Sequence, residues 1–237
     1  MVRFALVPAA VAWLALGSLW VRELPLSLCL APQMDGMSGL AAHVRAGFAM
    51  AEPMRLAGEW ALMLAAMMLP LTAPMVGHVW ARSFPARRTR AVGLFLGGYL
   101  LVWAIATAAA TPVLIVARGA VGALGAAPVL GLIGAMLAAW WQLTASKRLA
   151  LNRCHGTVPL RAFGSAADRD AASFGLLHGA RCVRVCLPVM VLPMLGGAGL
   201  SAMAVIFVLL LGERSQHTPQ LDRSALILVL LGLLSLA

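Results

Sequence analysis

Charged residues, and acidic residues above all, are scarce in this chain of 237 residues. Only 11% of the residues are charged, and 8 acidic residues stand against 18 lysines and arginines. Hydrophobic residues make up 62% of the sequence, whereas the apolar share of a soluble domain is about half. This composition excludes an ordinary soluble domain and predicts an integral membrane protein.

Several motifs of energy coupling and catalysis are missing as well. The sequence has no Walker loop, no Asp-Lys-Thr-Gly phosphorylation sequence and no nucleophile elbow. It also has only 4 cysteines, too few for a disulfide framework in a chain of this length. We therefore expect a protein that is not an enzyme and that does not pump by hydrolysing ATP.

Long apolar runs predict an all-α bundle of six or seven transmembrane helices. A hydrocarbon core about 30 Å thick needs roughly 20 apolar residues per helix. Such runs cover residues 4–21, 60–79, 91–116, 127–145, 174–195, 199–212 and 225–237. The six-helix alternative makes 174–184 interfacial and 185–212 one kinked span, but the glycines between residues 196 and 199 favour a turn and two helices. Gly93 and Gly97, four residues apart, are expected to let neighbouring helices approach closely.

Basic residues gather in two short segments and predict the topology. The segment after the second run holds Arg82, Arg87, Arg88 and Arg90, and the segment after the fourth holds Lys147, Arg148, Arg153, Arg161 and Arg169. By the positive-inside rule both segments are cytoplasmic, which also places the N-terminus inside. The net charge of +10 thus indicates membrane topology, with the lipid bilayer as partner and no nucleic acid.

One predicted helix carries soft electron donors at every fourth position: His178, Cys182, Cys186, Met190 and Met194. A step of four residues turns a helix by about 400°, so neighbouring donors can share a ligand and the end ones cannot. A functional row would therefore form two or more successive sites. The alternative is packing, because methionine fills gaps and cysteine behaves as a small apolar residue.

The run 60–79 offers a counterpart to this row. Met63 and Met67 lie one turn apart, and His78 follows Met67 by three turns on nearly the same face. If the two helices are antiparallel, these methionines lie at the depth of the outer methionines of the row, and His78 lies at the depth of its inner end. The alternative is that Pro70 and Pro74 kink the helix and methionine fills the gaps.

The donor types indicate which metal such groups would choose. Thiolate and thioether ligands select Cu(I), thiolate and imidazole also suit zinc, and hard oxygen ligands are nearly absent from the runs. Adjacent Cys154 and His155 add a further candidate in the second basic segment, either as a thiolate favoured by positive neighbours or as a loop cysteine without function. Copper(I) is the expected metal and zinc the alternative.

Three motifs extend this interpretation. The first is W-x-x-M-x-x-A-M-M-x-P-x-x-x-P-M from Trp60 to Met75. The second joins Gly98, Tyr99 and Trp103 to Gln142, Lys147 and Cys154, and the third comprises Gly175, Gly179, Cys182, Cys186, Met190, Met203 and Glu213. Together they resemble an uncharacterised bacterial family of predicted metal-binding integral membrane proteins over about residues 60–214. The resemblance implies a multi-pass protein of the bacterial inner membrane, with one integral domain divided into 1–59, a core 60–214 and a last helix in 215–237.

The sequence also departs from these motifs. Trp141, Ala150, Arg184, Val185 and Leu187 replace expected motif residues, and half of the expected thiols are absent. Two functions therefore compete: binding, delivery or transport of Cu(I) by ligand exchange, in service of a copper-dependent membrane enzyme, or a non-catalytic scaffold subunit of a larger membrane complex. A third hypothesis makes His78 and His178 haem ligands, or Cys182 and Cys186 an electron-transfer dithiol.

Overall fold

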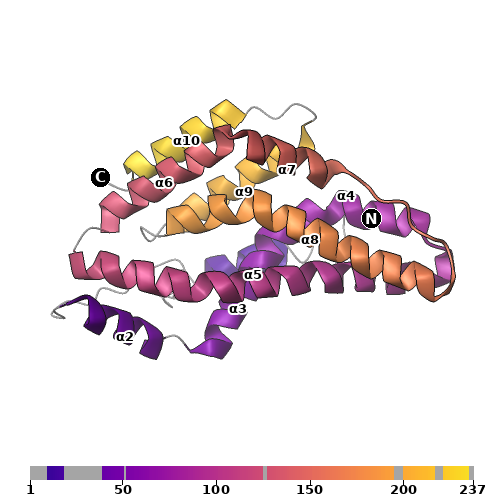
Figure 1. Ribbon diagram of the computed structural model, residues 1–237, viewed down its shortest axis with the longest axis horizontal. Coiled ribbons are helices and arrows are strands. Elements are labelled where there is room, and N and C mark those ends of the chain that lie inside the picture. The colour runs from indigo at the N-terminus through magenta and orange to yellow at the C-terminus, as the bar shows by residue number, and fades with distance from the viewer. Residues whose placement is uncertain are drawn as a thin grey trace.

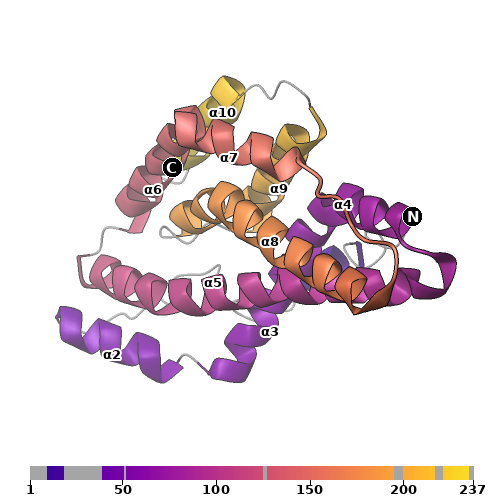
Figure 2. The ribbon, with the colours of Figure 1, turned by 45° about the vertical axis from the view of Figure 1, so that its right-hand side comes forward.

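The computed structural model describes residues 10–18, 39–50, 52–124, 127–194, 200–216 and 221–234, and every regular element in these ranges is a helix (Figure 1 and Figure 2). The helices are a segment at 10–18, α2 (Leu40–Met50), α3 (Pro53–Met63), α4 (Leu69–Arg82), α5 (Arg88–Leu124), α6 (Ala127–Leu143), α7 (Ala145–His155), α8 (Gly164–Met194), α9 (Leu200–Ser215) and α10 (Leu221–Leu234), with a π-helical turn η1 (Leu64–Met68) and a short 3-10 helix η2 (Pro85–Arg87). The all-α class is confirmed.

Three helices of the described chain are long and apolar enough to cross a membrane: Pro53–Arg82, Pro85–Ala120 and Gly164–Val191. The helices α6 and α7 pass the same test only together, and they bend by 66° where they meet. The helices α9 and α10, of 16 and 14 residues, are shorter than the roughly 20 residues of a straight span. The run 4–21 is described only from residue 10 to residue 18, so the count of six or seven spans stays a prediction.

After residue 174 the structure describes two helical stretches, because α8 continues without a break from Gly164 to Met194 and α9 begins at Leu200. The segment 174–184 is thus part of one long helix with the residues that follow it. Residues 195–199 lie outside the described ranges, so the choice between two spans and one kinked span stays a prediction. The glycines on which the expected turn rests lie outside the described residues, between the two helices.

Proline shapes the first long helix in a way that the sequence only partly predicts. Pro70 has no N–H to bond the carbonyl of Ala66, four residues earlier. The chain widens into the π-helical turn η1 just before Pro70, and the Ala66 carbonyl accepts a hydrogen bond of 3.1 Å from the indole Nε1 of Trp13 instead. Because such turns redirect side chains, η1 fixes the direction of Met67 and Met68.

The long helices α5 and α8 run parallel and make an extensive contact with each other (Figure 1 and Figure 2). Glycine brings their backbones together: a Cβ at Gly175 would overlap the carbonyl oxygen of Phe95, and one at Gly98 would lie 2.6 Å from the carbonyl oxygen of Ala172. Gly179 lies in the same way against the Tyr99 backbone. The expectation for Gly93 and Gly97 is wrong, because both face open space. One residue turns a helix by 100°, which is enough to move the contact from Gly97 to Gly98.

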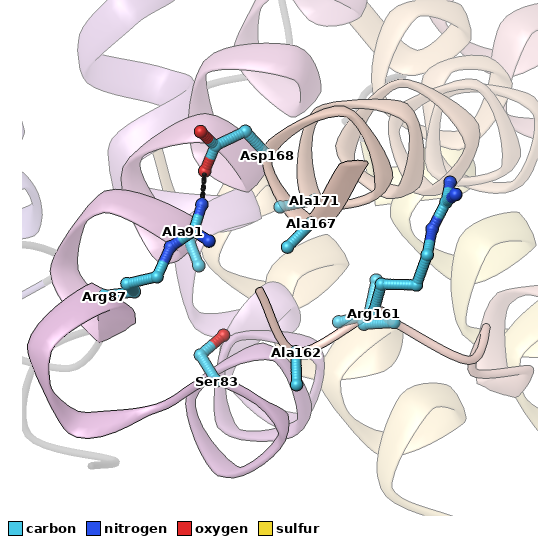
Figure 3. A pocket seen from close by; sticks show the side chains of 9 residues that line it. Ser83, Arg87, Ala91, Arg161, Ala162, Ala167, Asp168 and Ala171 are labelled. Carbon is cyan, nitrogen blue, oxygen red and sulfur yellow. Dashed lines mark hydrogen bonds and ion pairs between the residues drawn. The ribbon is translucent and has the colours of Figure 1, made fainter. Parts of the chain in front are cut away.

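The first basic segment lies against the start of α8, where the second basic segment ends. Lys147 and Arg153 of the second segment lie further along α8, beside Val185 and Arg181, so the shared cytoplasmic placement of the two segments stays a prediction. The Nη2 atoms of Arg87 and Arg90 lie 2.5 and 2.7 Å from the carboxylate of Asp168, joining the start of α5 to the start of α8. Figure 3 shows Arg87 turned toward Asp168 beside a small pocket, while the Arg161 side chain extends away from it. The pocket has a volume of about 10 Å³, room for about one water molecule.

The backbone contact between α5 and α8 predicts that alanine at Gly175 is destabilising. Overlap with the Phe95 carbonyl forces the helices apart and should lower the free energy of unfolding by about 1–3 kcal/mol. Gly93→Ala, on the open side of α5, is the matched control and should be neutral or stabilising, since alanine is the better helix former. Thermal unfolding in detergent compares the two variants, and equal melting temperatures would contradict the close contact.

Candidate metal centre

Two cysteines on α8 form the centre of the site. Cys182 and Cys186 lie one turn apart on its inward face, both are fully buried, and their Sγ atoms are 3.8 Å apart. A disulfide needs about 2.05 Å, so both are free thiols. Positions i and i+4 share a helix face, and the backbone contact with α5 turns this face inward.

Side chains of α5 complete one wall of the site. The Tyr99 hydroxyl lies 3.3 Å from the Cys182 Sγ atom, and Trp103 is buried one turn further along α5. The indole Nε1 of Trp103 is a buried donor without a hydrogen-bond partner among the described residues. The thiol pair therefore lies against two aromatic residues, one of which has an unused polar atom.

Other sulfur-containing side chains are buried in the same hydrophobic cluster as this pair. We call the following buried residues of one hydrophobic cluster the sulfur core: Met63, Met67, Met68, Cys154, Cys182, Cys186, Met190 and Met203. The predicted donors Met63, Met67 and Met190 thus point inward, on the same side as the two thiols. The side chain of Met194 lies outside the described residues. Inward orientation brings these donors into one core, and metal ligation by them stays a prediction.

The two predicted histidines are engaged with other partners. The Nε2 atom of His178 lies 3.1 Å from Arg214 Nη2, and because a guanidinium only donates, Nε2 accepts and the imidazole is neutral. His78 donates from Nε2 to the Val158 carbonyl at 3.1 Å. The ring of Phe174 contacts both histidine rings. In the described structure neither Nε2 atom is free to bind a metal or a haem iron.

Cys154 and His155 do not act as a pair. Cys154 is buried in the sulfur core, whereas His155 is exposed and donates to the Arg214 carbonyl at 3.1 Å. Consecutive residues of a helix point about 100° apart, and the segment predicted as a loop is the helix α7. The described residues contain no group of three or more His, Cys, Asp and Glu side chains that would hold a metal. Cys154 therefore does not join the thiol pair as a third ligand in this conformation.

A buried ion pair supports the site from the other side. Lys147 Nζ lies 2.9 Å from Glu213 Oε2 and donates to the Val185 carbonyl at 3.2 Å, next to Cys186. Gln142 donates to the second carboxylate oxygen of Glu213 at 2.6 Å. All three side chains are buried. The network joins α6, α7, α8 and α9 at the level of the thiols.

The sequence motifs include Gln142, Lys147 and Glu213, but no role or pairing was predicted for them. Lys147 was expected in a basic cytoplasmic segment, whereas its side chain points inward to Glu213. A further signal was their place beside apolar runs, where an ionisable side chain pairs or performs a function. Arg214, which faces the thiols, was missed altogether.

The comparisons with known proteins agree with this chemistry. A family model described as a copper chaperone, PpoB2, matches residues 57–235. The chain therefore belongs to the PpoB2 copper chaperone family, and the matched region contains the thiol pair, the methionines of the sulfur core and the buried ion pair. No matching curated protein and no matching solved structure was found. The description supports a copper-related function and favours a non-catalytic one.

The buried ion pair predicts non-additive mutations. Lys147→Met or Glu213→Met alone leaves one uncompensated buried charge and should lower the free energy of unfolding by about 3–5 kcal/mol. The double variant Lys147→Met, Glu213→Met removes both charges and should recover most of that loss. Unfolding in detergent gives the free energy of unfolding of the unaltered chain, the two single variants and the double variant.

The exposed pair of Arg148 and Asp222, at 4.0 Å, is the control for this cycle, and Asp222→Asn should change the free energy of unfolding by less than about 1 kcal/mol. Losses that simply add in the double variant would contradict the pairing of Lys147 with Glu213.

Proposed function

We propose that this member of the copper chaperone family holds Cu(I) inside the membrane between Cys182 and Cys186 and passes it to a copper-dependent membrane enzyme. The observation that carries the proposal is the fully buried thiol pair, 3.8 Å apart, within a core rich in methionine. No group in the site needs to perform catalysis, because holding and releasing a metal is ligand exchange.

The spacing of the two sulfur atoms suits a shared metal ion. With metal–sulfur bonds of about 2.3 Å, as in zinc thiolates, two sulfurs bound to one ion lie at most about 4.6 Å apart. The 3.8 Å between Cys182 Sγ and Cys186 Sγ lies within this limit. Two S–H protons leave as two copper–sulfur bonds form, and the oxidation state of copper does not change. Soft sulfur donors favour Cu(I), and the buried carboxylate of Glu213 is already held by Lys147 and Gln142.

Thioethers extend the site beyond the thiols. Met190 lies one turn after Cys186 on the same face of α8, a rise of about 6 Å, and η1 and α3 contribute Met67 and Met63 to the same sulfur core. Copper can thus pass from thiolates to neutral thioethers by exchanging one ligand at a time. An acceptor protein with a higher affinity for Cu(I) sets the direction of copper transfer.

The membrane setting is part of the proposal. Three apolar helices of sufficient length support a multi-pass protein of the bacterial inner membrane. We place the end where the first basic segment meets the start of α8 in the cytoplasm. The thiols then lie nearer the cytoplasmic end of α8 than Met190 does. The recipient is expected to be a membrane oxidase or monooxygenase whose copper site is loaded within or beyond the bilayer.

A scaffold subunit remains the second candidate, favoured by one observation. The described residues hold no cluster of three classical ligands, and each thiol already has a close neighbour in the core, Tyr99 for Cys182 and Cys182 for Cys186. Such a protein would bind no copper and would co-purify with other membrane subunits.

Copper content separates the two functions. The full chain, purified in detergent and loaded anaerobically with Cu(I), should retain about one copper per chain, and Cys182→Ala, Cys186→Ala should lose most of it because the two thiolates are the strongest soft donors. His155→Ala is the matched control, since that side chain faces away from the core, and it should bind copper like the unaltered chain. Equal copper in all three proteins would reject the thiol site, and no copper in any of them would favour the scaffold.

A further inference from the structure

Arg214, at the end of α9, points into the site although no donor row or motif included it. Its Nη2 atom donates to the Leu71 carbonyl at 3.3 Å and to His178 Nε2 at 3.1 Å. Its Nη1 atom is buried without a hydrogen-bond partner among the described residues. His178 lies one turn before Cys182 on the same face of α8, so the contact with His178 places the guanidinium beside the thiol pair. It therefore presents a positive charge to the thiols.

This charge has no counter-charge of its own in the described chain. No carboxylate there forms an ion pair with Arg214, and its two acceptors, a carbonyl and a neutral imidazole, carry no net charge. The other cation near the pair, Lys147, is already neutralised by Glu213. Arg181 is turned to the backbone carbonyls of Arg153 and Gly156. Arg214 is half-buried as a residue, and its Nη1 atom is fully enclosed. An enclosed positive charge without a counter-charge is costly unless something supplies the opposite sign.

The charge of the loaded site depends on the metal. Two thiolates and one monovalent ion make a complex of charge −1, which Arg214 brings to zero. Two thiolates and one divalent ion make a neutral complex, which leaves Arg214 uncompensated. In a medium of low dielectric constant this difference of one charge is worth far more than in water. The two loaded states release the same two protons, so proton release does not offset the difference.

We propose that Arg214 is a specificity-determining residue that makes the Cys182–Cys186 site select a monovalent soft cation over a divalent one. The inference rests on the proposed function and adds the charge class of the ion that the site accepts. It decides between the two metals that the donor types alone allow, in favour of Cu(I) and against zinc. Arg214 need not touch the metal, because it acts through the net charge of the interior.

The test compares a monovalent and a divalent soft cation on the full chain in detergent. Ag(I), which cannot change oxidation state here, represents Cu(I), and Cd(II) represents zinc. Dissociation constants are measured by competition with a soluble thiol ligand, and the readout is the ratio of the Cd(II) constant to the Ag(I) constant. Loss of a counter-charge should lower this ratio by about tenfold or more in Arg214→Gln and in Arg214→Met.

Two controls keep the readout specific. Arg214→Lys retains the charge and should retain most of the ratio, although it loses the paired hydrogen bonds to Leu71 and His178. Arg148→Gln removes an exposed charge of α7 and should leave the ratio within about threefold. A merely structural role of Arg214 would weaken both metals alike and leave the ratio unchanged.

The outcomes separate this inference from the proposed function. Variants of Arg214 that leave the ratio unchanged, while Cys182→Ala, Cys186→Ala abolishes Ag(I) binding, would overturn the selectivity and keep the thiol site. Ag(I) binding that survives the loss of both thiols would overturn the proposed function itself. If neither Arg214→Gln nor Arg214→Met folds, the unaltered chain still tests the proposal. Cd(II) bound as tightly as Ag(I) by that chain would overturn the selectivity.

Discussion

Glycine at the crossing of α5 and α8 lets two long helices meet backbone to backbone. At Gly175 there is no room even for a methyl group against Phe95, and Gly98 and Gly179 extend the same contact. The contact sets the rotation of α8 about its own axis, because only the glycine face can approach so closely. With that rotation fixed, Cys182 meets the Tyr99 hydroxyl and both thiols face the interior. The position of the thiols thus depends on the glycines that let α5 and α8 pack closely.

The second constraint is electrical neutrality inside an apolar core. Lys147 and Glu213 neutralise each other within 2.9 Å, and their hydrogen bonds reach Gln142 and the Val185 carbonyl. Arg214 has neutral acceptors only, and so does the more exposed Arg181, which donates to backbone carbonyls. A positive charge that has no carboxylate partner among the described residues and that lies beside two thiols suits an anionic complex. The geometry of the thiols and the charge of Arg214 therefore support the same soft, monovalent cargo.

The sequence predicts the fold class and the inward face of single helices well, because hydrophobic runs and the period of the helix are local properties. The row at 178, 182, 186 and 190 is buried as its spacing predicts, and α8 and α9 are separate helices. What the sequence does not predict is which face of a neighbour meets that row. Gly98 rather than Gly97 makes the contact, since a rotation of 100° separates the two, and no single-sequence pattern fixes that rotation.

Charged and histidine residues were harder to place for the same reason. Lysine next to an apolar run usually marks a membrane boundary, yet the bend between α6 and α7 turns Lys147 inward to Glu213. His178 lies in the predicted row, but its Nε2 atom accepts a hydrogen bond from Arg214, a residue 36 positions away. Cys154 and His155 are neighbours in sequence and face opposite surroundings because they lie on a helix. The surroundings of each of these side chains are set by residues that are distant in the chain.

The central claim is that copper is held by sulfur alone in this core. X-ray absorption at the copper edge, recorded on the Cu(I)-loaded full chain, tests it directly, because sulfur and nitrogen neighbours of copper scatter differently. We predict sulfur atoms as the only nearest neighbours, with His178 still bound to Arg214. Nitrogen neighbours with the pattern of an imidazole ring, or oxygen neighbours, would contradict the account.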